Sequence, residues 1–156
     1  MKIITWNCNG IRARFPLIEK LIENENPDVV FLQETKIEDK IFPSQSFFDL
    51  GYNHLFFRGE KSYNGVACIS RIPFDDSGYR NWSNLEDCRH IYIRFNELTI
   101  NNFYVPAGGD IPDINNEKFK HKVSFLLEVA SWLSEKPTWR KEILLGDLNI
   151  APLPDD

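Results

Sequence analysis

The sequence predicts an α/β fold, because strand patterns and helical patterns alternate along the chain. Residues 2–6 (KIITW) and 28–33 (DVVFLQ) are strand patterns, and apolar residues between Phe15 and Ile22 recur at helical spacing. Strand, helix and strand in this succession form a βαβ unit. The second strand is apolar without alternation, as expected of a strand that is covered on both faces.

The next elements follow from apolar spacing and turn residues. The first helix is expected to have Pro16 in its first turn and to end at Asn26-Pro27. A short helix is predicted at 44–50, with Gly51 as its C-cap. Further β-rich patterns occupy 52–58, 65–70, 90–95 and 98–104, and Asn96-Glu97 is a hairpin turn between the last two.

A long amphipathic helix is predicted from about residue 116 to residue 134. Its buried face is expected to hold the apolar residues at helical spacing, namely Phe119, Val123, Leu126, Leu127, Ala130 and Leu133. The last strand is predicted at 142–146 (EILLG), where the three central residues favour burial. Because the chain stops soon after this strand, we expect it to be a fragment.

Composition and charge place limits on the class of protein. Of the 156 residues, 42% are hydrophobic and 26% are charged, which is typical of a soluble domain. The net charge of −5 argues against a non-specific nucleic-acid coat. The chain has no apolar stretch long enough for a membrane span, no signal-peptide pattern, and no CxxC pair among its three cysteines. We therefore expect a cytoplasmic location and no membrane partner.

Four of the predicted strands end on polar, oxygen-bearing residues. These residues are Asn7, Glu34, Tyr104 and Asp147, with Asn149 two positions further on. Ligands of open α/β sheets bind beyond the carboxyl ends of the strands. Carboxylate and amide oxygens without histidine or cysteine favour Mg²⁺ or Mn²⁺. The strand ends therefore predict a metal-dependent phosphoesterase.

Each of these residues also has a purely structural interpretation. Asp147 and Asn149 point to the same side if the backbone stays extended, but Gly-Asp-x-Asn taken alone is more typical of a turn. Glu34 follows a buried strand and needs a partner, which is either a cation or Lys36. Asn7 either orients a ligand or begins the turn into the first helix.

Five short motifs then follow one another over the whole chain: TWNCNGIRA at 5–13, LQETK at 32–36, YNGVA at 63–67, YVP at 104–106 and GDLNIAP at 146–152. In this order they resemble the exonuclease III family, the abasic-site endonucleases of the endonuclease/exonuclease/phosphatase superfamily. QE and GDxN alone fit the superfamily broadly, including phosphoinositide phosphatases and sphingomyelinases. The NGIRA and QETK forms point to its DNA-repair branch.

The resemblance implies a DNase I-like four-layer α/β sandwich and a Mg²⁺- or Mn²⁺-dependent DNA-repair nuclease. The implied reaction is hydrolysis of the phosphodiester 5′ to an abasic site, with 3′→5′ exonuclease and 3′-phosphatase activities. The implied partner is double-stranded DNA with abasic sites or 3′ ends, and the full-length enzyme is implied to be monomeric. The implied metal ligands are Asn7, Glu34, Asp147 and Asn149.

The resemblance also implies a role for each of the other site residues. Asp147 takes the proton of the attacking water, Asn149 stabilises the transition state, and Tyr104 contacts the scissile phosphate. DNA contacts are implied for the remaining three residues, Asn9, Arg12 and Tyr63. Arg12 would meet phosphates, which fix the register of the DNA without reading its sequence.

The sequence departs from the family pattern in two places. Where the family commonly has Asn or Gln after Tyr-x-Pro, this chain has Ala107, with Asp110 further along the same loop. The family's chain also continues past GDxN to a further catalytic Asp, aromatic residues that wedge the DNA, and a closing Ser-Asp-His. We therefore expect residues 1–156 to be the N-terminal part of one endonuclease/exonuclease/phosphatase-type domain, truncated after the GDxN strand and inactive or nearly inactive by itself.

Two other functions fit the same sequence. A superfamily phosphatase or phosphodiesterase would release phosphate from a lipid or small phosphoester without cleaving DNA. A truncated, non-catalytic module would bind DNA without turnover. The missing second half also predicts uncovered apolar surface, so the isolated chain is expected to dimerise or aggregate.

Overall fold

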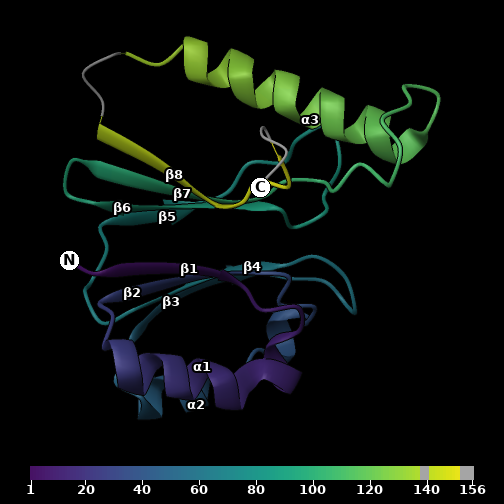
Figure 1. Ribbon diagram of the computed structural model, residues 1–156. Helices are drawn as coiled ribbons and strands as arrows, with labels where there is room; N and C mark the ends of the chain where they lie inside the picture. The colour runs from purple at the N-terminus through teal and green to yellow at the C-terminus, as the bar shows by residue number, and fades with distance from the viewer. Residues whose placement is uncertain (138–140, 152–156) are drawn as a thin grey trace.

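The computed structural model describes residues 1–137 and 141–151, which form two facing four-stranded sheets (Figure 1). The first sheet has the order β1 (Ile3–Asn7), β2 (Val29–Gln33), β4 (Val66–Ser70), β3 (His54–Arg58). The second has the order β5 (Asp76–Gly78), β6 (His90–Phe95), β7 (Leu98–Tyr104), β8 (Lys141–Asp147).

The helices cover the two outer faces of the sheet pair and make it a four-layer sandwich. In Figure 1, α1 (Ile11–Glu25) and α2 (Ser44–Asp49) lie on the outer face of the first sheet, and α3 (Glu117–Ser134) lies on the outer face of the second. A short 3₁₀ turn, Asp39–Ile41, precedes α2. The predicted α/β sandwich is thus confirmed. Among the described residues, no helix is long and apolar enough to cross a membrane.

The first three elements form the predicted βαβ unit. β1 and β2 are parallel, with Asn7 opposite Gln33 at their carboxyl ends. All five residues of β2 are buried, because alternate side chains pack toward α1 and toward the second sheet. The expectation for Pro16 was wrong: α1 already begins at Ile11, so the proline lies inside the helix rather than in its first turn.

The second sheet brings two polar strand ends together. β6 and β7 form the predicted hairpin through Asn96-Glu97, and β6 alternates as expected, with Ile91, Ile93 and Phe95 buried. β7 and β8 are parallel, so Tyr104 lies opposite Asp147. Because β1 faces β8 and β2 faces β7, all four strand ends meet at one edge of the sandwich.

The buried face of α3 differs from the predicted one. Phe125 is fully buried against Trp82, and Val129 and Trp132 pack beside it, whereas Leu127 is 66% exposed. Ala130, another residue of the predicted stripe, is also exposed. The actual stripe follows the aromatic residues because Trp82, from the loop before β6, supplies the surface on which they pack.

Candidate active site

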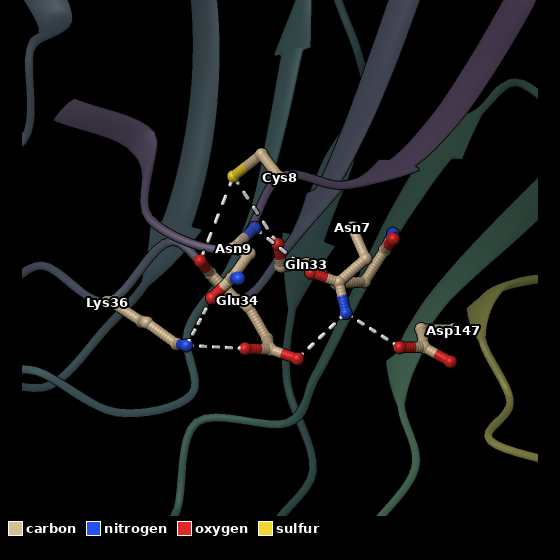
Figure 2. A network of polar contacts seen from close by, with 7 residues as sticks. All are labelled: Asn7, Cys8, Asn9, Gln33, Glu34, Lys36 and Asp147. Atoms are coloured by element: carbon tan, nitrogen blue, oxygen red, sulfur yellow. Dashed lines mark hydrogen bonds and ion pairs between the residues drawn. The ribbon is translucent and has the colours of Figure 1, made fainter. Parts of the chain in front are cut away.

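The candidate site is assembled from both sheets, with an asparagine side chain as the link. The Asn7 side-chain amide Nδ2 donates to Glu34 Oε1 at 2.8 Å and to Asp147 Oδ2 at 2.7 Å (Figure 2). Glu34 follows β2 of the first sheet, and Asp147 ends β8 of the second. One amide group thus holds two carboxylates that are 113 residues apart in the chain. The predicted convergence of the strand ends is observed, although it joins two sheets rather than one sheet edge.

The segment after β2 turns sharply and is held on both sides. Glu34 and Lys36 have φ angles of 53° and 52°, in the left-handed region that residues with a Cβ rarely adopt. The carbonyl of Glu34 accepts a hydrogen bond from the backbone N–H of Gly10 at 2.7 Å, and the N–H of Lys36 donates to the carbonyl of Asn64 at 2.9 Å. Such strain persists only where the surroundings enforce it, and it is concentrated at functional sites.

Three side chains donate hydrogen bonds to the Glu34 carboxylate. Besides Asn7, the ammonium of Lys36 lies 2.8 Å from Oε2, and the hydroxyl of Tyr104 donates to the same group. Burial by itself raises the pKa of Glu34, but the hydrogen bonds from these three donors outweigh it and lower the pKa below its usual range. The ion pair with Lys36, one of the two partners predicted for Glu34, is therefore present in the structure.

Tyr104 is held between the carboxylate and an arginine. Burial, together with its hydrogen bond to Glu34, raises the pKa of Tyr104 to about 12, so its hydroxyl remains a donor at neutral pH. The Arg89 guanidinium lies 4.7 Å from the centre of the Tyr104 ring and also forms an ion pair with Asp87. Sequence reasoning missed Arg89, because the residue lies at the start of a strand and carries no motif.

Asp147 and Asn149 form the turn that was the structural alternative to a catalytic pair. The backbone N–H of Asn149 donates to Asp147 Oδ1 at 3.0 Å, and the φ of Asn149 is 48°, so the backbone is not extended here. The Asn149 side chain donates to the carbonyl of Val105 at 2.8 Å. Both oxygens of Asp147 therefore accept hydrogen bonds, which orients this carboxylate beside Glu34.

The three predicted DNA-contacting residues lie outside this cluster of hydrogen bonds or at its margin. The side chain of Asn9 accepts a hydrogen bond from Lys36, and its backbone N–H donates to Asn7 Oδ1 at 3.0 Å. Arg12 is exposed in the first turn of α1, and Tyr63 is 71% exposed in the loop between β3 and β4. Their positions leave them accessible to a large ligand.

The residues of the cluster fit a magnesium-type cation. Glu34 and Asp147 offer carboxylate oxygens without histidine or cysteine, which matches a hard divalent ion. Asn7 turns its Nδ2 toward them, while its Oδ1 accepts from the backbone N–H of Asn9. Within the described residues, no group of three or more His, Cys, Asp or Glu side chains could hold a metal. Mg²⁺ needs fewer, because it is commonly held by one or two carboxylates while waters and substrate phosphates complete its coordination.

A separate cavity of about 660 Å³ lies away from this cluster. Its walls include Thr99 of β7 and both Lys141 and Glu142 of β8, at the opposite ends of these strands from Tyr104 and Asp147. Arg94 of β6, which pairs with Thr99, also lines it. None of the predicted site residues lines it. The candidate site is therefore separate from this cavity.

The fold and the cluster define a two-sheet α/β protein with an oxygen-rich site at its edge. The chain belongs to the Endonuclease/Exonuclease/phosphatase family, whose family model matches residues 4–156. Exodeoxyribonuclease III of Haemophilus influenzae is 33% identical over 162 residues, which cover 97% of this chain and 58% of that protein. Exodeoxyribonuclease of Bacillus subtilis is 27% identical over 156 residues, which cover 97% of this chain and 59% of that protein.

Solved structures of similar proteins have the same fold. The 3′ phosphatase NExo from Neisseria, bound to a product DNA hairpin, is 31% identical and superposes with a TM-score of 0.88. The match covers all of this chain and 60% of the NExo chain. An AP endonuclease from Archaeoglobus fulgidus matches with the same coverage and TM-score at 32% identity. This chain therefore spans about three fifths of the length of these relatives, with the DNase I-like sandwich that the motifs implied.

Proposed function

We propose that this chain carries the first part of the active site of a DNA-repair nuclease. The reaction is hydrolysis of the DNA phosphodiester 5′ to an abasic site, with 3′→5′ exonuclease and 3′-phosphatase activities at DNA ends. The observation that carries the proposal is the Asn7 amide group that bridges Glu34 and Asp147. The names of the similar proteins, an exodeoxyribonuclease III, an AP endonuclease and a 3′ phosphatase, support the same reaction class.

The proposed chemistry gives each side chain of the cluster one task. Glu34, with Asn7 beside it, holds Mg²⁺ or Mn²⁺, which supplies charge stabilisation to the phosphate when bound. Asp147 accepts the proton of the attacking water, because its carboxylate is already oriented by two hydrogen bonds. Tyr104 donates its hydroxyl to the phosphate, since its raised pKa keeps the proton in place. Asn149 stabilises the developing charge from the neighbouring turn, which places it beside Asp147.

The proposed substrate is double-stranded DNA that lies across the edge of the sandwich. Arg12 supplies a phosphate contact at the start of α1, and Asn9 and Tyr63 lie on the flanking loops. An abasic sugar is easily extruded toward the carboxylates, because it has no base to unstack. Further parts of the proposal are a single domain continuing beyond the GDxN strand, a monomeric full-length enzyme and a cytoplasmic location.

The proposal is tested with the chain in excess over a labelled duplex that contains one abasic site. With Mg²⁺, a nick 5′ to the site is expected, at a low rate because the chain spans about 60% of its relatives. EDTA is expected to stop the reaction. Asp147→Asn is expected to slow it by at least about 100-fold, the smallest usual effect of losing a general base. Glu23→Gln, the same type of change on the exposed face of α1, serves as the control and should leave the rate unchanged.

Other outcomes would select the competing functions. Release of phosphate from a phosphoinositide, with intact DNA, would identify a phosphatase of the same superfamily. Tight binding of the abasic duplex without any nick would identify a DNA-binding module. A nick that persists in Asp147→Asn would show that the cleavage does not come from this site.

A further inference from the structure

Two buried amide side chains lie between the two sheets, beside the apolar residues of the inter-sheet core. Gln33 is 1% exposed and Asn102 is 0% exposed. Each belongs to a row of alternate residues that faces the opposite sheet. The row on β2 runs through Val29 and Phe31, and Ile100 precedes Asn102 on β7. A buried amide is costly unless it is fully hydrogen-bonded, so this pair needs an explanation.

All four N–H bonds of the two amides have acceptors, and these acceptors lie on both sheets. Gln33 Nε2 donates to Asn102 Oδ1 at 2.6 Å and to Thr5 Oγ1 at 3.0 Å. Asn102 Nδ2 donates to the backbone carbonyls of Leu32 and Ala67, at 3.0 and 3.3 Å. Asn102 of β7 is thereby tied to β2 and β4 of the facing sheet, and Gln33 ties β2 to β1. We call this set the inter-sheet amide network.

Directional bonds add something that apolar contacts between sheets do not. Hydrophobic contact is non-directional and tolerates a small sliding of one sheet over the other. Three of the four bonds run between the sheets. Hydrogen bonds lose strength steeply when their geometry is disturbed, so these three specify one relative position. The inter-sheet amide network therefore fixes the register of the second sheet against the first.

This register decides the geometry of the active site, because the site is divided between the sheets. Gln33 pairs with Asn7 across β1 and β2 and directly precedes Glu34, and Figure 2 shows it beside Asn7. Asn102 lies two residues before Tyr104 and pairs with Leu145, two residues before Asp147. The network thus lies one step inside the sandwich from the two carboxylates that Asn7 bridges.

We propose that Asn102 and Gln33 are positioning residues that hold Glu34 and Asp147 at the separation that a divalent cation and a phosphate require. The proposal rests on the proposed function, since it assigns a task to residues behind that same site. Neither residue touches the cation or the substrate. Both act through the relative position of the sheets.

The test compares two buried asparagines that are neighbours on β7. Asn102→Leu removes the network, whereas Asn101→Leu removes an equally buried amide on the other face of the sheet, where it contacts His90 and Glu142. Mn²⁺ affinity is measured by electron paramagnetic resonance, and the Asn7 side-chain amide is observed by NMR without metal. The midpoint of urea unfolding reports global stability in each variant.

Asn102→Leu is expected to weaken Mn²⁺ binding by about tenfold, as outer residues of metal sites commonly do when changed. It is also expected to shift the Asn7 side-chain amide resonance, and Asn101→Leu is expected to do neither. Gln33→Leu should reproduce both effects, and the double variant should add little because the bonds are shared. If Asn102→Leu does not fold, Asn102→Ser, which keeps a small hydrogen-bonding group, takes its place.

The proposal would be overturned if Asn102→Leu left the Asn7 resonance unchanged, or if Asn101→Leu changed Mn²⁺ affinity and the Asn7 resonance as much as Asn102→Leu does. The network would then be only a hydrogen-bonded part of the core. The NMR measurement needs neither metal nor DNA. If the proposed nuclease function is wrong, DNA is not cleaved but Asn102→Leu still shifts the Asn7 resonance. If the positioning role is wrong, DNA is cleaved but Asn102→Leu leaves the Asn7 resonance unchanged.

Discussion

Mild acid is expected to destabilise this fold through one buried histidine. His90 is 1% exposed beneath α3, where its Nδ1 accepts from the N–H of Arg80 at 3.1 Å and its Nε2 lies 3.2 Å from Asn101 Oδ1. Burial lowers the pKa of His90 from 6.5 to about 4. The unfolded chain therefore binds a proton that the folded chain excludes, and stability falls as the pH drops from above 6.5 toward 4.

The size of the effect follows from the two pKa values. One pKa unit corresponds to about 1.4 kcal/mol, so the complete loss is about 3 kcal/mol, and about 2 kcal/mol of it develops between pH 7.5 and pH 5. Because small domains are stable by only about 5–15 kcal/mol, a loss of this size is readily measured. His121, whose pKa is also lowered by burial, adds a smaller effect of the same sign.

The assay is urea unfolding followed by tryptophan fluorescence at pH 5.0 and 7.5. His90→Gln keeps a hydrogen-bonding group but cannot titrate, so its free energy of unfolding should change less between the two pH values, by about 2 kcal/mol. All carboxylates and His121 remain in both proteins and cancel in the comparison. Equal pH dependence of the two proteins, within about 0.5 kcal/mol, would refute the reasoning.

Three further predictions concern packing. Phe125→Ala should destabilise the chain by about 3–5 kcal/mol, whereas Leu127→Ala, on the exposed face of α3, should change stability by less than about 0.5 kcal/mol; urea midpoints distinguish them. Gly146→Ala should prevent stable folding, seen as loss of the unfolding transition, because its φ is 125° and a Cβ would lie 2.0 Å from a carbonyl oxygen of the neighbouring strand. The isolated chain should self-associate in sedimentation through the edge strand β8, where Leu144 is 38% exposed. Leu144→Lys should reduce this association. An unmodified chain that stays monomeric at high concentration would contradict the prediction.

The strand ends of the site could be predicted because their signal is local. An apolar run followed by a polar residue marks the end of a strand, and parallel pairing brings such ends together. The sequence therefore placed Asn7, Glu34, Tyr104 and Asp147 in one cluster. The division of these residues between two sheets could not be predicted from spacing, because a strand pattern does not show which strand it pairs with.

Features that depend on distant partners could not be predicted in this way. The apolar residues of α3 cover more than one stripe, and the choice of Phe125 over Leu127 is made by Trp82, which lies in an irregular loop. Asn102 looks like a solvent-facing strand residue until its three hydrogen bonds to the facing sheet are known. The left-handed backbone of Glu34 is likewise imposed by other loops rather than by its own type.

The two halves of the site differ in how firmly they are held, and this difference has a functional consequence. The segment that carries Glu34 is bonded to the start of α1 on one side and to the turn at Asn64 on the other. Asp147 ends β8, which is the last strand in its sheet order and pairs with β7 alone among the described strands. Local opening begins where few bonds restrain the backbone. The half that carries Glu34 should therefore persist under conditions that already release the half that carries Asp147, so that weakened packing separates the two carboxylates before the whole chain unfolds.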